Sequence, residues 1–238
     1  MKLAISGAHG RMGQTIAKLA FADPEIEVVA LLEQAGHPKA AEPVNGAEVS
    51  TDNSCILPAN ALIEFTLPEG TLQNLEAALH YGVPMVIGTT GFTPEGLAAI
   101  KAAAQKIPIV FSSNMSVGVN TLFKLIEIAS AKLDCTHIRI EETHHVHKKD
   151  KPSGTAKTMA EIAEKAANKQ VHQIDSFREG EVIGDHTIFL ETNEDILTIS
   201  HHAKDRSMFA KGAILAAKYL QNKKPGLYTM QDVLGFNV

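Results

Sequence analysis

The sequence has little of what marks an extracellular, membrane-spanning or nucleic-acid-binding protein. It contains two cysteines, Cys55 and Cys135, in 238 residues. They lie about 80 positions apart and match neither a CxxC pair nor a zinc motif, so we expect reduced thiols in a cytoplasmic protein. No apolar run approaches the roughly 18 residues of a membrane span, and the first residues lack the apolar segment of a signal peptide.

Positive charge is also too scarce for a general nucleic-acid binder. The formal net charge is −5, whereas such proteins usually carry a basic face. We therefore expect no nucleic-acid partner and no membrane partner, although a local basic cluster can still bind a small anion. The hydrophobic share of 45% and the charged share of 21% are ordinary for a globular protein with one large domain or two small ones.

The first 115 residues alternate between short apolar runs and segments with helical spacing. The apolar runs predict buried strands, and Pro68 near the start and Gly82 past the end mark one of the helices. The predicted strands are 2–6, 25–33, 61–66, 84–90 and 107–114, and the predicted helices are 14–23, 68–82 and 93–106. This order predicts an α/β fold with a Rossmann-type, doubly wound parallel sheet.

The pattern changes in the second half of the chain. We expect a long helix at 117–133, a strand at 137–145 and a helix at 155–169. Residues 186–203 have the pattern of two strands joined by a tight turn, and strands joined in this way are antiparallel. A last helix at 207–221 precedes a short tail. The second part is therefore predicted to be an α+β unit with a separate, mixed sheet.

A glycine-rich turn follows the first predicted strand. Gly7, Gly10 and Gly13 have the spacing GxxGxxG, and such glycines let a pyrophosphate approach the backbone at a helix N-terminus. Glu33 follows Gly13 by 20 residues and ends the second strand, where a carboxylate can accept hydrogen bonds from ribose hydroxyls. This context favours a dinucleotide site. The alternative is a tight turn without a ligand, with Glu33 solvated at the strand end.

Two residues beside this turn bear on which dinucleotide would bind. Arg11 either stacks on the adenine or contacts a phosphate, or it is an ordinary surface residue. Gln34 is neutral, whereas a site for NADPH would prefer a cation that meets the 2′-phosphate. The sequence thus favours NADH and leaves NADPH open.

The turns after two later strands are further candidates for cofactor binding. "GTTGF" spans residues 88–92 and "SSNMSVGVN" spans residues 112–120. Ligands of a doubly wound sheet bind outside the carboxyl ends of its strands, so we expect both turns beside the nicotinamide. The alternative is that they are ordinary connections between a strand and a helix.

The stretch "EETHHVHKKDKPSGTAK", residues 141–157, has three interpretations. A metal site is disfavoured, because His144 and His145 point to opposite faces of an extended segment and the flanking lysines repel a dication. A solvated charged loop is the second interpretation. The third is an acid–base centre, in which a substrate carboxylate binds the N–H groups of Gly154 and Thr155 at a helix start, close to His144 and Lys148.

Taken together, these motifs resemble the 4-hydroxy-tetrahydrodipicolinate reductase family, which acts early in the diaminopimelate route to lysine. The segments that carry the resemblance occur in the family's order from residue 3 to the C-terminus: "GAHGRMG", "VIGTTGF", "SSNMSVGVN", "EETHHVHKKDKPSGTA" and "GLYTMQDVLG". The histidine–lysine stretch with "PSGTA" is highly specific to the family, whereas the glycine turn is not. The resemblance implies an NAD(P)H-dependent oxidoreductase that adds a hydride to C4 of a cyclic dicarboxylate with loss of water, giving tetrahydrodipicolinate.

The resemblance also implies roles for individual residues. His144 would be a proton donor or acceptor and Lys148 a proton donor, without a metal. His145, Gly154 and Thr155 would bind substrate carboxylates. The cofactor would be held by Gly7, Ala8, His9, Gly10, Arg11 and Met12, with Glu33 on the adenosine ribose, and its nicotinamide would be lined by Gly88, Thr89, Thr90, Ser112, Ser113, Asn114 and Met115.

Family members are usually homotetramers joined through the second sheet, and their last helix returns to the nucleotide domain. We therefore expect a discontinuous dinucleotide-binding domain of residues 1–115 and 206–238, and a substrate-binding and oligomerisation domain of residues 116–205. Two residues depart from the family pattern. Val146 stands where the family often has arginine, which bears on substrate affinity, and Gln34 stands where members that use both cofactors often carry arginine.

Other functions remain open from the residues alone. A redox sensor that binds NAD(H) without turnover would leave the histidine–lysine cluster unused. An aspartate-semialdehyde or homoserine dehydrogenase could share the layout, although the first needs a nucleophilic cysteine, and a chelator would inhibit a metal-dependent hydrolase. Tyr219 and Lys223 have the YxxxK spacing of short-chain dehydrogenases, but they close the last predicted helix, where a packing role is favoured.

Overall fold

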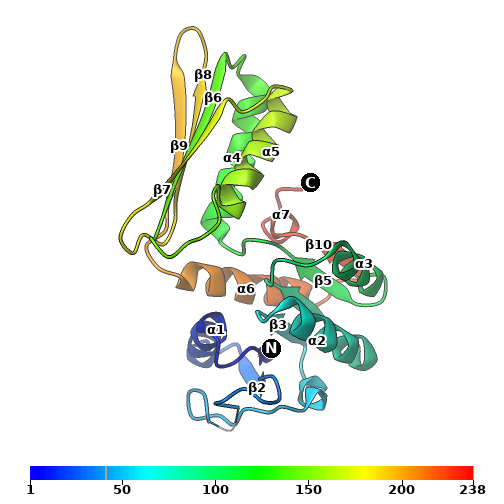
Figure 1. Ribbon diagram of the computed structural model, residues 1–238. Helices are drawn as coiled ribbons and strands as arrows, with labels where there is room; N and C mark the ends of the chain where they lie inside the picture. Colours follow the sequence, from blue (N-terminus) through cyan, green and yellow to red (C-terminus); the bar gives the residue numbers. More distant parts are fainter. Residues whose placement is uncertain (41, 238) are drawn as a thin grey trace. The chain divides into compact units, whose positions relative to one another are not determined.

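The computed structural model describes residues 1–40 and 42–237. The chain divides into two compact units, Met1–Ser116 with Phe209–Val238 and Val117–Met208. Each unit has its own sheet, as the element labels in Figure 1 show. The predicted fold class, a Rossmann-type α/β sheet with a second α+β unit, is confirmed.

The sheet of the first unit has six strands, and every pairing in it is parallel. The strand order is β10-β5-β4-β3-β1-β2. The strands are β1 (Lys2–Ser6), β2 (Glu27–Leu32), β3 (Ala61–Glu64), β4 (Met85–Ile87), β5 (Pro108–Phe111) and β10 (Gly226–Tyr228). The order reverses direction at β1 and β3, and in sheets of this kind ligands bind outside the carboxyl ends of the strands at that point.

Helices cover both faces of this sheet because its strands are apolar on both faces. Ile5 packs in one core with Ile16 of α1, whereas the neighbouring Ala4 packs in the opposite core with Leu75 of α2. The first core is covered by α1 and α6, and the second by α2, α3 and a 3₁₀ turn. These elements are α1 (Arg11–Ala22), η1 (Asn53–Ile56), α2 (Pro68–Tyr81), α3 (Pro94–Ala103) and α6 (Ser207–Leu220), and the short α7 (Met230–Val233) follows β10.

Local chemistry explains where the helix with the clearest sequence signals begins and ends. Pro68 opens α2, where its missing N–H would have no helical partner, and Gly82 closes it in the left-handed region with φ +69°. Both predicted signals are confirmed. Helix α1 begins at Arg11 rather than at the expected Gln14, so the last glycine of the turn lies inside the helix.

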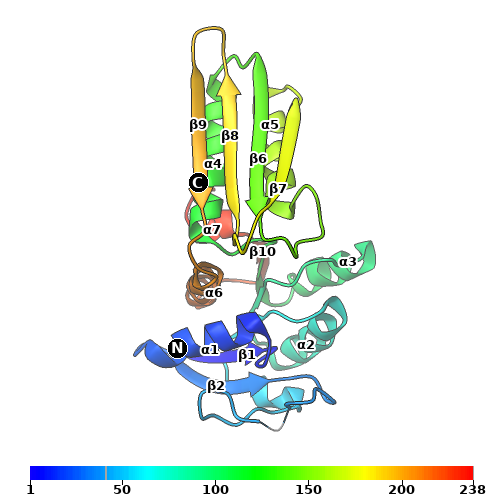
Figure 2. The same cartoon turned by 60° about the vertical axis from the view of Figure 1, so that its left-hand side comes forward.

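The second unit is a four-stranded mixed sheet with two helices on one face (Figure 2). Strand β6 pairs parallel with β7 and antiparallel with β8, which pairs antiparallel with β9. Alternate residues of β6 are buried against the helices, including Ile138 and Ile140 of the core. The elements are β6 (His137–His144), β7 (Gln173–Arg178), β8 (Asp185–Glu191), β9 (Ile196–His202), α4 (Val117–Lys132) and α5 (Gly154–Ala167).

Two strands and one short helix lie where the sequence predicted none. Strand β7 is an edge strand whose residues are at most half-buried, so it lacks the apolar alternation that marks a strand. Strand β10 has three residues and joins β5 across more than a hundred positions of sequence. The predicted short tail is therefore wrong, because residues 226–233 add a strand and helix α7.

Candidate active site

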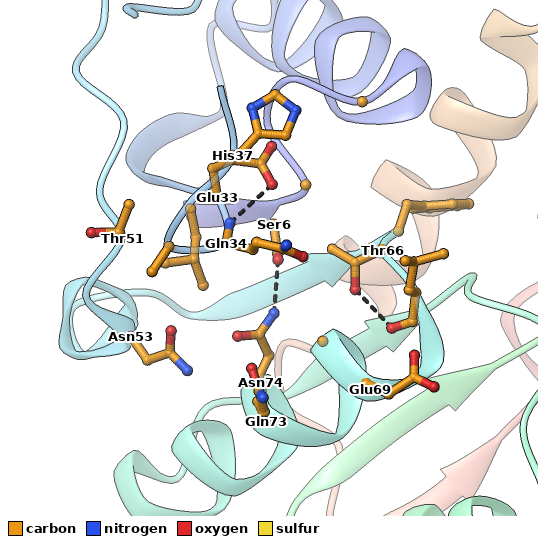
Figure 3. Close-up of a pocket in the computed structure, with 17 residues that line it drawn as sticks. Ser6, Glu33, Gln34, His37, Thr51, Asn53, Thr66, Glu69, Gln73 and Asn74 are labelled. Atoms are coloured by element: carbon orange, nitrogen blue, oxygen red, sulfur yellow. Dashed lines mark hydrogen bonds between the residues drawn. The ribbon is translucent and has the colours of Figure 1, made fainter. Parts of the chain in front are cut away.

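A pocket of about 690 Å³ opens at the carboxyl ends of β1, β2 and β3 (Figure 3). It lies where the strand order reverses, entirely within the first unit. Of the residues predicted to bind a cofactor, Gly7, Gly10 and Glu33 line it. Its other lining residues are Ser6, Leu32, Gln34, Ala35, His37, Thr51, Asn53, Phe65, Thr66, Leu67, Glu69, Gly70, Gln73 and Asn74.

The glycine turn is too tight for side chains at two of its positions. Gly7 has φ +70°, and a Cβ there would lie 2.8 Å from the Phe65 carbonyl oxygen. A Cβ on Gly13 would lie 2.0 Å from the Gly7 carbonyl oxygen. The N–H of Gly10 donates to the Gly7 carbonyl at 2.9 Å and completes the turn. The turn thus presents the start of α1 to the pocket, as a pyrophosphate site requires.

Glu33 is buried at the end of β2 and is bonded to the glycine turn. Its carboxylate accepts the backbone N–H of His9 at 3.0 Å and that of Gln34 at 2.9 Å. The His9 ring stacks on that of His37 with centroids 5.3 Å apart, and the buried His9 Nε2 has no hydrogen-bond partner in the described structure. Glu33 therefore fixes the turn and still faces the pocket with the remaining lone pairs of its carboxylate.

A fully buried carboxyl group, Glu64, lies at the end of β3 beneath the pocket lining. The Asn74 amide donates to Glu64 at 2.7 Å and to the Ser6 hydroxyl at 2.8 Å, and the Thr66 hydroxyl also donates to Glu64. Burial raises the pKa of Glu64, against the opposing effect of the hydrogen bonds from Thr66, Asn74, Ser6 and Thr71. This network fixes three residues that line the pocket: Ser6, Thr66 and Asn74.

The predicted nicotinamide turn at Gly88 packs against residues that line the pocket. A Cβ on Gly88 would lie 2.2 Å from the Phe65 ring, which lines the pocket. The Thr89 hydroxyl accepts the Thr66 N–H at 3.1 Å, and Thr90 is exposed. Gly88, Thr89 and Thr90 are outside the pocket lining, so their contact with a nicotinamide stays a prediction.

The second predicted nicotinamide turn follows β5. The Ser112 hydroxyl donates to the Asn114 carbonyl at 2.8 Å, and the Asn114 side chain accepts the Ser116 N–H at 2.9 Å. The Met115 side chain is 1% exposed and belongs to the core, which leaves its backbone as the part available for a ligand. Ser113 is exposed. The structure thus gives this turn a defined shape, and its role in cofactor binding stays a prediction.

The histidine–lysine segment lies in the second unit and begins on β6. Glu142 and His144 both belong to the buried face of that strand, and the His144 Nδ1 atom is hydrogen-bonded to the Glu142 carboxylate. Sequence alternation places them on one face because residues two apart on a strand point the same way. The pair is therefore an imidazole with a buried carboxylate partner, an arrangement that suits proton transfer.

Arg178 of β7 binds both this pair and the loop that follows it. Its guanidinium contacts Glu142 through two nitrogens, at 3.0 and 3.1 Å, and its side chain is 9% exposed. It also donates to the carbonyls of Phe177 at 2.5 Å, Lys148 at 3.2 Å and Asp150 at 2.5 Å. All five N–H groups of the guanidinium are thus used, and the loop carrying Lys148 is fixed to the strand that carries His144.

The loop between β6 and α5 holds the other predicted residues. Lys148 is paired with Asp150 at 2.8 Å, and its side chain is 24% exposed. The Lys148 N–H donates to the His145 carbonyl at 3.1 Å, which makes a tight turn. His145 is half-buried, and its buried Nδ1 has no hydrogen-bond partner in the described residues.

Helix α5 begins at the predicted anion site. Ser153 caps it by accepting the Ala156 N–H at 3.2 Å, and the Ser153 N–H donates to Glu142 at 3.3 Å. Gly154 and Thr155 are the first two residues of the helix, at the end where the helix dipole favours an anion. The contact between Glu142 and Ser153 therefore links this helix start to the partner of His144.

Burial keeps the His144 ring neutral, and hydrogen bonds keep Glu142 ionised. Burial lowers the pKa of His144, and the nearby charges of Lys148 and Arg178 add to this, outweighing the hydrogen bond and the charge of Glu142. Burial alone would raise the pKa of Glu142, but the hydrogen bonds from Arg178, Ser176 and His144 outweigh it and lower that pKa. Burial also lowers the pKa of His186 on β8 to about 3, with a smaller contribution from the positive charge that His144 carries when it is protonated.

Among residues 1–40 and 42–237, no group of three or more His, Cys, Asp or Glu side chains is arranged to hold an ion. In the same ranges, none of the helices has the length and apolar character needed to cross a membrane.

Tyr219 packs edge-on against Tyr228 and lies under the Lys223 ammonium at 4.0 Å, which is the expected packing role.

Several site residues were missed by the sequence analysis. Glu142 and Arg178 cannot be recognised as a pair from the sequence, because they are 36 positions apart and belong to different strands. Glu142 stands two positions before His144 in an alternating segment, and that spacing was the available signal. Asn74 and Glu64 were missed because nothing local indicates that an amide of α2 reaches a buried acid of β3.

The fold and the two sites define the class of protein: an α/β protein with a Rossmann-type nucleotide-binding unit and a second unit that carries a cluster of ionisable side chains around His144. Residues 1–115 match the family described as the N-terminus of dihydrodipicolinate reductase, and residues 118–234 match its C-terminus. The chain therefore belongs to the dihydrodipicolinate reductase family, a family of oxidoreductases.

Individual relatives are similar along almost their whole length. The 4-hydroxy-tetrahydrodipicolinate reductase of Bordetella pertussis is 38% identical, covering 98% of this chain and 97% of the relative. That of Nitrosomonas europaea is also 38% identical, covering 99% and 98%. A solved structure, the dipicolinate-bound dihydrodipicolinate reductase from Paenisporosarcina sp. TG-14, has a TM-score of 0.83 at 22% identity, with 98% of each chain covered. This last likeness supports the fold.

Proposed function

We propose that this protein is a 4-hydroxy-tetrahydrodipicolinate reductase, which converts its cyclic dicarboxylate substrate into tetrahydrodipicolinate and water with oxidation of NAD(P)H. The observation that carries the proposal is that both halves of the chain match the two halves of one reductase family. The described sites are consistent with it, since one unit holds a nucleotide pocket and the other an acid–base cluster. The reaction belongs to the diaminopimelate route to lysine.

The first unit would bind the cofactor, which supplies a hydride for ring carbon C4 when bound. The fit of the site rests on the glycine turn, where a side chain at Gly7 or Gly13 would fill the space beside the start of α1. The turn of Gly7, Gly10 and Arg11 would hold the pyrophosphate at that helix start, and Glu33 would accept hydrogen bonds from the adenosine ribose. The turns at 88–90 and 112–115 would line the nicotinamide.

The same pocket supports a preference for NADH over NADPH. Its described lining includes Glu33 and Glu69 but neither lysine nor arginine. A 2′-phosphate would bring two negative charges close to Glu33 without a cation to offset them, and Gln34 is neutral. We therefore expect NADH to be the better substrate in kcat/KM.

The second unit would bind the dicarboxylate. Gly154 and Thr155 would bind a substrate carboxylate at the start of α5, where the helix dipole favours an anion, and the His145 Nδ1, which has no hydrogen-bond partner among the described residues, is a further polar atom for it. His144 would accept or donate a proton, and the Lys148 ammonium would donate one. Such general acid–base catalysis is worth roughly 10²–10⁴-fold in rate.

The open face of the second sheet is the proposed subunit interface. Phe177 and Ile196 lie on it with 52% and 57% of their surface exposed, and exposed apolar side chains on one face favour association. We expect a homotetramer assembled through this face, in the cytoplasm. Residues 116–205 would then serve both substrate binding and assembly, and residues 1–115 with 206–238 would bind the cofactor.

The proposal is tested by following absorbance at 340 nm while the product of dihydrodipicolinate synthase is supplied with NADH or NADPH. Oxidation of NADH with substrate-dependent kinetics is the expected result. Absence of oxidation with either cofactor would contradict the proposed function. A chelator serves as the control for metal-dependent chemistry and is expected to leave the rate unchanged.

A further inference from the structure

Glu142 is the most heavily hydrogen-bonded carboxylate of the second unit's cluster, and none of the roles proposed above uses it. It is 1% exposed and contacts three elements: His144 on its own strand, Arg178 on β7 and the Ser153 N–H at the start of α5. We infer that Glu142, held by Arg178, is a positioning residue that fixes His144 with its proton on Nδ1 and makes Nε2 the atom that exchanges protons with substrate. This rests on the proposed function.

The position of the proton follows from the partners of Glu142. Its two oxygens receive hydrogen bonds from the two terminal nitrogens of Arg178, which can only donate. A buried carboxylate beside a guanidinium stays ionised, and an ionised carboxylate can only accept. The hydrogen bond between Glu142 and His144 Nδ1 therefore requires a proton on Nδ1, which leaves a lone pair on Nε2.

The surroundings of Nε2 support its role as the reactive atom. A Cβ on Gly184 would lie 3.0 Å from His144 Nε2, so the absence of a side chain there leaves space beside that nitrogen. The His186 ring packs edge-on against His144 with centroids 5.0 Å apart, and its own Nε2 lies 3.4 Å from the Ser153 hydroxyl. His144 is thus held by Glu142 and packed against His186, and the missing side chain of Gly184 leaves space beside Nε2.

The charged and titratable groups that face His144 come from every neighbouring element. Three are charged, namely Glu142 on β6, Arg178 on β7 and Lys148 in the loop, and the fourth is the titratable His186 on β8. Burial keeps His186 neutral, and burial with the two cations keeps His144 neutral, so its free nitrogen acts as a base. When His144 becomes an imidazolium during turnover, the Glu142 charge stabilises it, as the carboxylate does in other carboxylate–histidine pairs.

This arrangement divides the proton transfers between the two proposed catalytic residues. Neutral His144 takes a proton at Nε2 from the ring carbon beside C4, between C4 and the imine carbon, as the C4–O bond breaks. The electron pair of that C–H bond becomes the new C=C bond, and the hydroxyl leaves as water with a proton from the Lys148 ammonium. After hydride addition at C4, the electron pair of the new C=C bond moves into the conjugated imine, and the carbon next to C4 takes its proton back from the His144 imidazolium, which restores the imine and neutral His144. Lys148 regains a proton from solvent, which is the one proton that the overall reaction consumes.

The direct test is the tautomer of His144 in the wild-type protein. Selective ¹⁵N labelling of histidine, with His144→Asn used to assign the signals, distinguishes the protonated from the lone-pair nitrogen by chemical shift. We expect protonated Nδ1 and lone-pair Nε2 near pH 7.5. A proton on Nε2 with none on Nδ1 would overturn the inference, and this readout needs neither turnover nor a variant of Glu142 that folds.

The kinetic test is Glu142→Gln beside the matched control Glu181→Gln. Glu181 also contacts a histidine, His147, at 3.3 Å, but both side chains are largely exposed. For Glu142→Gln we expect kcat to fall at least about tenfold and KM for NADH to change less than twofold. We also expect the acidic limb of the pH profile to move to lower pH, because the anion that raises the His144 pKa is gone. Glu181→Gln should match the wild type in all three.

The outcomes separate this inference from the proposed function. An unchanged kcat and pH profile in a folded Glu142→Gln variant would overturn the positioning role while the reductase assignment stands. Wild-type protein without any reductase turnover would instead refute the function, and the tautomer measurement would still decide the structural claim. Arg178→Lys is a second variant, expected to lower kcat with little change in KM for NADH, because a single ammonium cannot replace the five donors.

Discussion

The substitution Gly13→Ala tests the proposed cofactor turn with a single methyl group. A Cβ at this position would lie 2.0 Å from the Gly7 carbonyl oxygen, 2.7 Å from the Gly7 carbonyl carbon and 3.0 Å from the Ala8 Cα. All three atoms belong to the backbone of the turn, so no side chain can rotate to make room. The turn and the start of α1 must therefore move apart by more than an ångström.

The expected size of the effect follows from this displacement. Overpacking a well-packed site typically costs about 1–3 kcal/mol, and a clash with backbone belongs at the upper end. Part of that cost is lowered stability, and part is lost cofactor affinity, because the N–H groups at the helix start no longer point at one phosphate position. A loss of about 1.4 kcal/mol in binding is tenfold in Kd, so we expect the NADH Kd to rise at least about tenfold.

The assay is NADH binding by calorimetry together with urea unfolding, and the control is Gly96→Ala in helix α3. A Cβ on Gly96 would meet the Phe92 side chain at 3.2 Å, a ring that can shift, and alanine is favoured over glycine inside a helix. The control should therefore bind NADH as the wild type does. Wild-type affinity and stability in Gly13→Ala would refute the account of the turn.

Three further predictions follow from the other parts of the site. Burial raises the pKa of Glu64 above the ordinary value of 4.5, so the wild type should lose stability relative to Glu64→Gln as pH rises above 4.5, by at most about 1.4 kcal/mol per pH unit. Urea unfolding that shows a constant difference across pH would contradict this. His144→Ala and Lys148→Ala should each lower kcat at least about tenfold with NADH affinity kept, and normal turnover in both would remove these residues from the chemistry. Ile196→Asp should dissociate the proposed tetramer in light scattering, and a wild-type monomer would disprove that interface.

The first unit was largely predictable because its signals are local. The glycine turn, the apolar strands and the Pro68 and Gly82 boundaries each depend on a few consecutive residues, and the structure confirms the elements that they indicate. The parallel order also follows from the alternation of strands and helices. Strand β10 was not predicted because a strand of three residues is too short to show an alternating apolar pattern. Its pairing with β5 depends on the fold of the whole unit.

The site was less predictable because its geometry depends on residues far apart in sequence. The sequence indicated His144 and Lys148 as candidates, but it left open whether they belong to a solvated loop. The structure adds Arg178, which joins the carbonyl of Lys148 to Glu142 and so to His144. Arg178 belongs to an edge strand without a clear pattern, so nothing local marks it as part of the site.

The central claim is tested most directly by tracing the hydride. The protein is incubated with the dihydrodipicolinate synthase product and NADH deuterated at both C4 positions of the nicotinamide, and the product is analysed by NMR and mass spectrometry. The account predicts one deuterium per product molecule, bound to ring carbon C4. Product without deuterium at C4, or deuterium on another carbon, would contradict it.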